Sequence, residues 1–388
     1  MNLKGNLLFC LLLLFFSTDS LLAQQLSLDE HVLNSKILNE EQKISVYLPE
    51  AYGENPDHRY PVLYALDGKY YKHMVSAVIA RFYSDWLIPE TIVVTIDNEN
   101  RIRDYTPTPH ATADVLSGKA DVFLDYIEKE LIPFVDSSYK TSEFRILQGH
   151  SLGGLLSLYT VQARPELFTA HYAFSPSLHW GDNKTVEKII TYLSSREALQ
   201  QFIYMNLGDE IVKSEYESRN AMRASFLRLQ TFFKEQSISG LRVKSEVLQS
   251  LPHAATNITG LVNATNELYR YWVLPFDAME RGPEAITEHY EKLSSDLYQE
   301  VKPRMESINF AADYVTNGIN SPVRGMKLLK YNAALYPDSA LVNFNLAKGY
   351  KQREEMKLAK KYGHKALKLT SLENEELKAS ITKFLETL

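Results

Sequence analysis

The sequence is almost free of cysteine. Cys10 is the one cysteine in 388 residues, and it lies inside an apolar stretch near the amino terminus. Once that stretch is removed, the chain holds no thiol, which excludes a cysteine nucleophile, a disulfide framework and a cysteine-ligated metal site. The ten histidines never occur in the spacing His-x-x-x-His. The sequence therefore predicts no metal site and no cofactor.

Neither sign of charge dominates the chain. It carries 42 Lys and Arg against 48 Asp and Glu, a net charge of -6. Such a chain lacks the basic footprint of a nucleic-acid-binding protein, so nucleic acid is not an expected partner. With 45% hydrophobic and 23% charged residues, the composition is that of a globular protein. The length favours two domains over one.

The longest unbroken apolar run stands at the start of the chain. Lys4 precedes the run 7–16, which is too short to span a bilayer, and Ala23 offers a cleavage point. This arrangement is typical of a secretory signal peptide over residues 1–23. Because Cys10 lies within the run instead of at its end, lipid attachment there is not favoured. The sequence predicts a secreted or periplasmic protein without a transmembrane span after signal removal, and an uncleaved membrane anchor is the alternative.

Residues 24–275 alternate between short apolar runs and longer helical stretches. Continuous apolar strands alternating with helices indicate a mostly parallel sheet covered on both faces. This region is therefore expected to be an α/β domain. The expected strands are 43–48, 61–66, 92–96, 144–147, 172–174, 202–205 and 243–248, and the clearest helices are 121–135 and 154–163.

Strand patterns end near Trp272, and residues 276–388 are expected to form a separate helical domain. Some residues follow the spacing of a tetratricopeptide repeat, namely Leu346, Ala347, Tyr350, Ala359 and Ala366. One good repeat and one poor one are too few for a free-standing solenoid. The region is predicted to pack on itself or on the first domain, and to offer a surface for a protein partner or for self-association. Generic helical hairpins explain the same spacing equally well.

The chemistry is expected where the strand 144–147 ends, in Gly149-His150-Ser151-Leu152-Gly153. A Gly-x-Ser-x-Gly pattern between an apolar strand and a helix is typical of the nucleophile elbow of an α/β-hydrolase fold. We expect Ser151 to be the nucleophile, held in a strained backbone conformation. The turn is sharp, so Gly149 and Gly153 are expected to relieve collisions with neighbouring strands.

A serine hydroxyl needs an adjacent base, which the order of this fold places after the last strand. His253 follows the strand 243–248 and is predicted to be the general base. The other histidines, His150 among them, precede the acid or lie in the helical domain. The acid should follow the strand 202–205, where two carboxylates compete. We prefer Glu210, with Asp209 second, and the order of the chain does not separate them.

An oxyanion hole needs two backbone N–H donors. One is expected from Leu152, directly after the nucleophile, and the other from the loop after the strand 61–66. Gly68 is the predicted donor in that loop, with Lys69 as the alternative, because a glycine lets the backbone approach the substrate closely.

Three segments give the chain a family resemblance. Tyr60 to Gly68, Asn98 to Pro107 and Gly149 to Gly154 resemble the Putative esterase (esterase D-like, enterochelin esterase-like) family of α/β-hydrolases. The likeness spans about 26–272, and the order with a tetratricopeptide-like carboxyl-terminal region is similar to secreted bacterial members. It implies Ser151, His253 and an acid as the catalytic residues.

Two substrate contacts are also expected, one from the resemblance and one from a loop over the cleft that follows Ser175-Pro176-Ser177. Arg101 matches a family element beside the substrate cleft, with an Arg–Asp pair that pins the loop as an equally good interpretation. Trp180 is predicted to line the cleft, with simple packing as the rival. The expected activity is hydrolysis of a small-molecule carboxylic ester, with a siderophore ester or an acylated saccharide as candidate substrate. A non-catalytic binding protein on a hydrolase scaffold and an acyltransferase are the alternatives.

Overall fold

A computed structural model describes residues 27–53, 57–110, 115–208, 217–370 and 374–388. The predicted signal peptide, residues 1–23, lies outside them. The chain divides into two compact units, the first ending at Glu267 and the second beginning at Leu268. This division falls slightly before the expected domain boundary at residue 275.

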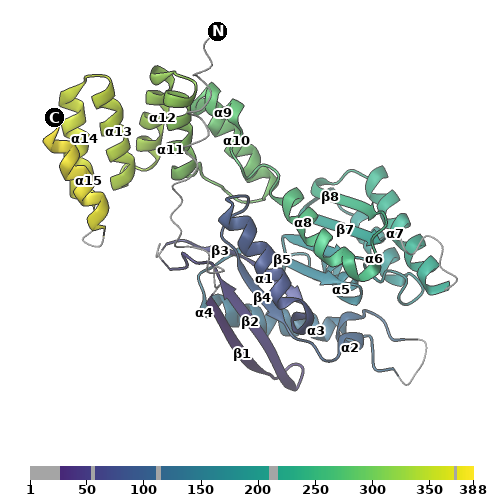
Figure 1. The fold of residues 1–388 in the computed structure, drawn as a ribbon. Helices are drawn as coiled ribbons and strands as arrows, with labels where there is room; N and C mark the ends of the chain where they lie inside the picture. The colour runs from purple at the N-terminus through teal and green to yellow at the C-terminus, as the bar shows by residue number, and fades with distance from the viewer. Residues whose placement is uncertain (1–26, 54–56, 111–114, 209–216, 371–373) are drawn as a thin grey trace, which may run out of the picture. The chain divides into compact units, whose positions relative to one another are not determined.

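The first unit is built on one sheet whose eight strands follow the order β1-β2-β4-β3-β5-β6-β7-β8 (Figure 1). β1 and β2 pair antiparallel, β2 and β4 also pair antiparallel, and the remaining neighbours are parallel. This confirms the expected mostly parallel sheet. The strands are Ser27–Ser35 (β1), Glu40–Leu48 (β2), Tyr60–Leu66 (β3), Ile92–Ile96 (β4), Thr141–His150 (β5), Ala170–Phe174 (β6), Ala198–Gly208 (β7) and Ser239–Leu248 (β8).

Helices cover the sheet, which explains why its inner strands read as unbroken apolar runs. β3 and β4 are buried at every residue, so both of their faces are covered. The helices of this unit are Gly68–Ser84 (α1), Arg101–Tyr105 (α2), Ala120–Tyr126 (α3), Ile132–Ser138 (α4), Leu152–Ala163 (α5), Lys184–Ser194 (α6), Glu217–Glu235 (α7) and Thr256–Leu268 (α8). A π-helical stretch, η1 (Ile127–Leu131), joins α3 to α4, and a short 3₁₀ turn, η3 (His253–Ala255), precedes α8.

The core of this unit forms two hydrophobic clusters. One gathers β2, β3 and β4 with the helical stretch from α3 to α4, and the other gathers β6 and β7 with α6 and α7. α5 contributes to both, with Leu156 in the first cluster and Leu155 and Leu158 in the second. The helix that follows the predicted nucleophile is therefore packed on two sides, which fixes the position of its first residue.

The carboxyl ends of β3 and β5 to β8 lie at the same edge of the sheet, because these strands are parallel. Their register pairs His150 with Phe174, Phe174 with Asn206, and Gly208 with Leu248. In open parallel sheets, ligands bind at this edge. The segments that follow these strands carry all the predicted catalytic and oxyanion-hole residues.

The second unit is helical throughout the part that the structure describes, as expected. Its helices are Phe276–Arg281 (α9), Pro283–Asp296 (α10), Met305–Asp313 (α11), Pro322–Leu335 (α12), Ala340–Gln352 (α13), Met356–Leu369 (α14) and Glu375–Glu386 (α15), with a π-helical turn, η4 (Tyr314–Gly318), after α11. The residues at the repeat spacing are buried on α13 and α14, where small Ala359 and Ala366 sit in the core. The tetratricopeptide character of this unit stays a prediction.

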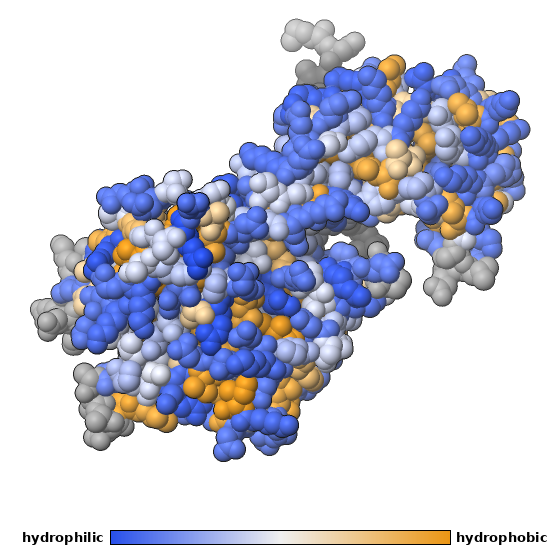
Figure 2. All heavy atoms as spheres, turned by 180° about the vertical axis from the view of Figure 1, so that it is seen from behind, coloured by the Kyte–Doolittle hydropathy of each residue, from blue (hydrophilic) through white to orange (hydrophobic). Residues whose placement is uncertain are grey.

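The described surface is mostly hydrophilic, with hydrophobic side chains in scattered patches (Figure 2). Tyr70, Leu116 and Ile258 are among the exposed large hydrophobic residues of the first unit. Within the ranges described, no helix has both the length and the hydropathy that a membrane crossing requires.

Candidate active site

The turn between β5 and α5 places Ser151 in a strained conformation, as the sequence predicts. Its φ is 58° and its ψ is -113°, a region that L-residues rarely adopt. Such a conformation costs about 1–3 kcal/mol and persists only when the surroundings enforce it. Here the Ser151 N–H donates to the carbonyl oxygen of Phe174 (2.9 Å), and its own carbonyl accepts from the N–H groups of Leu155 and Ser177 (3.0 Å each).

Only one of the two glycines that flank Ser151 at this spacing lacks room for a side chain. A Cβ at Gly149 would lie 2.3 Å from the carbonyl carbon and oxygen of Gly153, so this position tolerates only glycine. A Cβ at Gly153 would meet nothing closer than a Leu66 methyl at 3.4 Å. The expectation that Gly153 relieves a collision is therefore wrong. The crowding arises at Gly149, against the start of α5 and not against neighbouring strands. Gly154 is also crowded, with the Phe174 carbonyl oxygen 3.0 Å from a built Cβ.

Ser177 lies beside Ser151, the predicted nucleophile, and is not among the residues that the sequence predicts for the site. Its Oγ is 3.1 Å from Ser151 Oγ, within hydrogen-bond distance. The residue is 7% exposed and follows β6 in the turn Ser175-Pro176-Ser177. No sequence motif marks it, because the contact depends on β5 and β6 being neighbours in the sheet.

The predicted base, His253, opens η3 and is half-buried. Its carbonyl oxygen accepts two hydrogen bonds, from His150 Nε2 (2.9 Å) and from the Thr256 hydroxyl (2.7 Å). The ring centroids of His150 and His253 are 4.6 Å apart. Since His150 directly precedes Ser151 in the chain, these contacts bring His253 next to the turn that carries Ser151.

His150 is a second residue that sequence reasoning set aside. A carbonyl oxygen only accepts, so Nε2 of His150 carries the proton in its bond to His253, and Nδ1 faces the Tyr71 hydroxyl at 3.5 Å. Burial, assisted by the neighbouring His253, lowers the pKa of His150 to about 4. The ring is neutral near pH 7 and serves as a fixed donor. Its place inside the Gly-x-Ser-x-Gly motif was the available signal.

A buried polar network supports the segment that carries His253. Asn206, at the end of β7, accepts from the Ser175 N–H (3.0 Å) through its side-chain oxygen and donates to the Thr256 carbonyl (3.1 Å). The hydroxyls of Ser175 and Thr256 lie 2.8 Å apart. All three residues are buried. Buried networks with satisfied partners hold one arrangement, so the turn after β6 and the start of α8 are fixed together.

The two predicted oxyanion donors open two helices. Gly68 is the first residue of α1 and Leu152 the first of α5. The first N–H groups of a helix have no acceptor within that helix and carry its positive dipole end, which suits them to a developing oxyanion. A Cβ at Gly68 would lie 2.6 Å from Asp97 Oδ1 and 2.9 Å from Thr95 Cβ, so glycine is required there.

Arg101 binds the turn that presents Gly68. Its guanidinium donates two hydrogen bonds to the Asp67 carboxylate, from Nε (2.6 Å) and Nη2 (3.1 Å), and Nη2 also lies 3.4 Å from the His150 carbonyl. Asp67 is 1% exposed and has a left-handed φ of 61°. Its burial raises the pKa of the carboxyl, and Arg101 opposes that rise. Of the two interpretations of Arg101, these contacts agree with the Arg–Asp pair that pins a loop. A contact between Arg101 and the substrate stays a prediction.

Trp180 packs against the segment that follows α2. Its indole N–H donates to the Thr108 carbonyl (2.9 Å), and its ring lies 5.2 Å from that of His110. These are the contacts of a packing residue, and its predicted place in the wall of the cleft stays a prediction.

The predicted acids Glu210 and Asp209 lie outside the described residues. The last described residue before them is Gly208, where a Cβ would be 2.6 Å from the Leu251 carbonyl oxygen and 3.5 Å from the His253 nitrogen. The end of β7 therefore reaches the segment of the predicted base.

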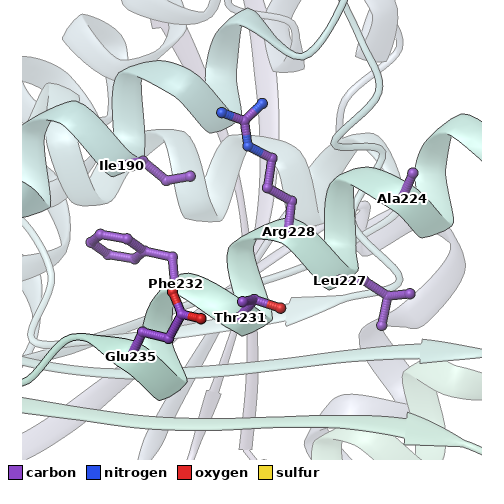
Figure 3. Close-up of a pocket in the computed structure, with 7 residues that line it drawn as sticks. All are labelled: Ile190, Ala224, Leu227, Arg228, Thr231, Phe232 and Glu235. Atoms are coloured by element: carbon purple, nitrogen blue, oxygen red, sulfur yellow. The ribbon is translucent and has the colours of Figure 1, made fainter.

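A surface hollow of about 470 Å³ lies between α6 and α7 (Figure 3). None of the predicted site residues lines it, and Arg228 at its edge is paired with Glu187 of α6. Among the residues that the structure covers, no group of three or more His, Cys, Asp or Glu side chains is placed to hold a metal ion.

The part of the chain that holds most of this site matches a known protein family. Residues 35–221 match the family described as Putative esterase. The match to this family, together with relatives named as siderophore esterases, shows a carboxylic ester hydrolase, as the sequence predicts.

Relatives of this domain include proteins whose names describe an activity. It is 28% identical over 202 residues to the ferri-bacillibactin esterase BesA of Bacillus subtilis, covering 47% of this chain and 70% of that one. It is 35% identical over 132 residues to the siderophore triacetylfusarinine C esterase of Aspergillus fumigatus, covering 31% of this chain and 45% of that one. The chain thus spans less than half the length of the Aspergillus enzyme.

Solved structures share the fold. An IroE-like serine hydrolase from Shewanella oneidensis matches with a TM-score of 0.71 and 23% identity, covering 80% of this chain and all of its own. An uncharacterised protein from Capnocytophaga ochracea matches with a TM-score of 0.64 and 16% identity, covering 93% of this chain and all of its own. At these identities the likeness describes architecture alone.

Proposed function

We propose that this chain is a secreted serine esterase that hydrolyses a carboxylic ester through an acyl-enzyme on Ser151. The observation that carries the proposal is the conformation of Ser151. A positive φ at a non-glycine residue between β5 and α5 costs free energy. The neighbouring turn enforces it, and the amides of Gly68 and Leu152 open helices at the same edge of the sheet.

In the proposed reaction, His253 removes the Ser151 proton as Oγ attacks the ester carbonyl carbon. The carbonyl π electrons move to oxygen, where the N–H groups of Gly68 and Leu152 donate to the oxyanion. On collapse, the bond to the alcohol oxygen breaks and the alcohol takes the proton from His253. Water, deprotonated by His253, then attacks the acyl carbon. The bond between this carbon and Oγ breaks, Oγ recovers the proton from His253, and the acid is released. Glu210 is the proposed acid that orients His253, with Asp209 second.

The proposed substrate is a siderophore ester, and an acylated saccharide is the second candidate. The named relatives support the first, because they are described as esterases of triacetylfusarinine C and of ferri-bacillibactin. The proposed signal peptide, 1–23, would deliver the enzyme outside the cytoplasm, and both candidate substrates would suit an enzyme located there. The pairing of Arg101 with Asp67 fits a role in holding the oxyanion turn.

The test of this proposal is hydrolysis by the mature chain, read by mass spectrometry. Enterobactin, triacetylfusarinine C and acetylated xylan oligosaccharides are each incubated with wild type and with Ser151→Ala. Opened or deacylated products that appear only with wild type support the proposal. Binding of these compounds without turnover would favour a non-catalytic binding protein, and products that require an added alcohol would favour an acyltransferase.

A further inference from the structure

The turn after β6 is attached to the nucleophile by three contacts. The Ser151 N–H donates to the Phe174 carbonyl (2.9 Å), and the Ser177 N–H donates to the Ser151 carbonyl (3.0 Å). The third contact joins the two hydroxyls, with 3.1 Å between Ser177 Oγ and Ser151 Oγ. Because the first two contacts fix both backbones, the third is set by the fold.

The sequence around both serines permits this approach. A Cβ at Gly154 would lie 3.1 Å from Pro176 Cα and 3.0 Å from the Phe174 carbonyl oxygen, so a larger residue would push the turn away. Ser175 adopts a φ of 41° and is held by the Asn206 side chain and the Thr256 hydroxyl. The close packing against Gly154, the Asn206 side chain and the Thr256 hydroxyl therefore together fix the turn that carries Ser177.

We infer that Ser177 is a further catalytic residue, whose hydroxyl donates a hydrogen bond to Ser151 Oγ and stabilises the charge that Oγ carries as it loses its proton. This inference rests on the proposed function, since it assigns a role in a reaction at Ser151. The direction of the bond follows from chemistry. The Ser151 proton must pass to His253, so the hydroxyl of Ser177 is the donor in the pair.

The hydrogen bond acts in both halves of the reaction. During acylation, Oγ gives its proton to His253 and forms a bond to the carbonyl carbon, while Ser177 keeps its own proton and only hydrogen-bonds to Oγ. In the acyl-enzyme, Oγ is an ester oxygen and a weaker acceptor. During deacylation, water attacks, the bond between Oγ and the acyl carbon breaks, and Oγ recovers a proton from His253. A donor that binds the charged oxygen more strongly than the neutral one accelerates both steps.

The experiment measures how fast Ser151 reacts with a fluorophosphonate, which forms a P–O bond to Oγ and releases fluoride. This probe reports nucleophile reactivity without a natural substrate, and intact-mass and peptide mass spectrometry locate the label. Since hydrogen bonds to charged groups contribute more than neutral ones, Ser177→Ala should label on the order of 10- to 100-fold more slowly. With p-nitrophenyl acetate, kcat should fall while KM changes little, as for an interaction made only in the transition state.

Ser157→Ala is the matched control. It also removes a buried serine hydroxyl, that of Ser157 in α5, which donates to the Leu147 carbonyl of β5 (3.1 Å) and does not contact Ser151. Its labelling rate should equal that of wild type. Equal rates for Ser177→Ala and wild type, or equal losses in the two alanine variants, would overturn the inference. A wild-type protein that takes no label at Ser151 would instead overturn the proposed function.

Discussion

The two glycines that flank Ser151 differ in what a methyl group would meet, which yields a quantitative prediction. In Gly149→Ala, the new Cβ would lie 2.3 Å from backbone atoms of Gly153, whereas ordinary contact begins near 3.4 Å. Strand and helix would have to separate by about 1 Å, the difference between these distances. Overpacking costs about 1–3 kcal/mol, and a rigid backbone partner places this change at the upper end, about 3 kcal/mol.

The activity of the same variant should fall further than its stability implies. A 1 Å displacement of a reacting group costs about 10²-fold in rate, and the elbow would be displaced by that amount. Gly153→Ala is the internal control. Its Cβ meets only a Leu66 methyl at 3.4 Å, and alanine is favoured over glycine in a helix by up to about 1 kcal/mol. We expect its free energy of unfolding to match or slightly exceed that of wild type.

Urea unfolding followed by circular dichroism gives the two free energies of unfolding, and p-nitrophenyl acetate gives kcat/KM. The predicted order of stability is Gly153→Ala at or above wild type, with Gly149→Ala clearly below. If both variants lose the same free energy, or if Gly149→Ala unfolds like wild type, the close approach of β5 and α5 is not the reason for glycine in this motif.

Three further predictions follow from the contacts around the elbow. Arg101→Leu leaves the buried Asp67 carboxylate without its ion-pair partner, so it should lower kcat/KM by at least about 10²-fold and the free energy of unfolding by about 3 kcal/mol. Arg101→Lys keeps the charge but lacks the forked donor, and its values should lie between those of wild type and Arg101→Leu. Wild-type kinetics in Arg101→Leu would refute this prediction. His150→Phe removes the donor to the His253 carbonyl and should lower kcat about tenfold, whereas His150→Gln keeps a donor and should retain more activity. Equal kcat in the two variants would contradict a role of His150 in positioning His253. Burial lowers the pKa of His150 and of His171 to about 4, so these residues bind protons in the unfolded chain at a higher pH than in the folded chain. The free energy of unfolding should therefore be greatest above about pH 6.5 and should fall toward pH 4 by up to about 3 kcal/mol per residue. Urea midpoints that stay constant over this pH range would contradict the prediction.

Much of the fold could be read from the sequence because buried strands leave a strong pattern. The run 92–96 coincides with β4, and β3, β5 and β8 contain their expected cores. β1 was missed because it lies at the edge of the sheet, where polar residues alternate with exposed Leu28 and Val32. Backbone pairing with β2 holds β1 in the sheet, and no apolar run in its own sequence indicates a strand.

The candidate site divides in the same way. Ser151 and His253 could be proposed from the sequence because a motif and the order of the fold mark them, and their catalytic roles stay predictions. The motif includes His150, but the contacts of His150 and Ser177 could not be predicted, since they depend on a backbone carbonyl that no residue type encodes and on which strands are neighbours. For Gly153, the motif predicts glycine, and the structure assigns the crowding to its partner Gly149.

The central claim is that Ser151 forms the acyl-enzyme, and one comparison tests it most directly. Hydrolysis of p-nitrophenyl acetate and butyrate is measured for the mature chain and for Ser151→Ala at equal protein concentration. The account predicts turnover by wild type and a loss on the order of 10⁴- to 10⁶-fold in the variant. Equal turnover by the two proteins would contradict it, because the esterase activity would then arise elsewhere in the chain.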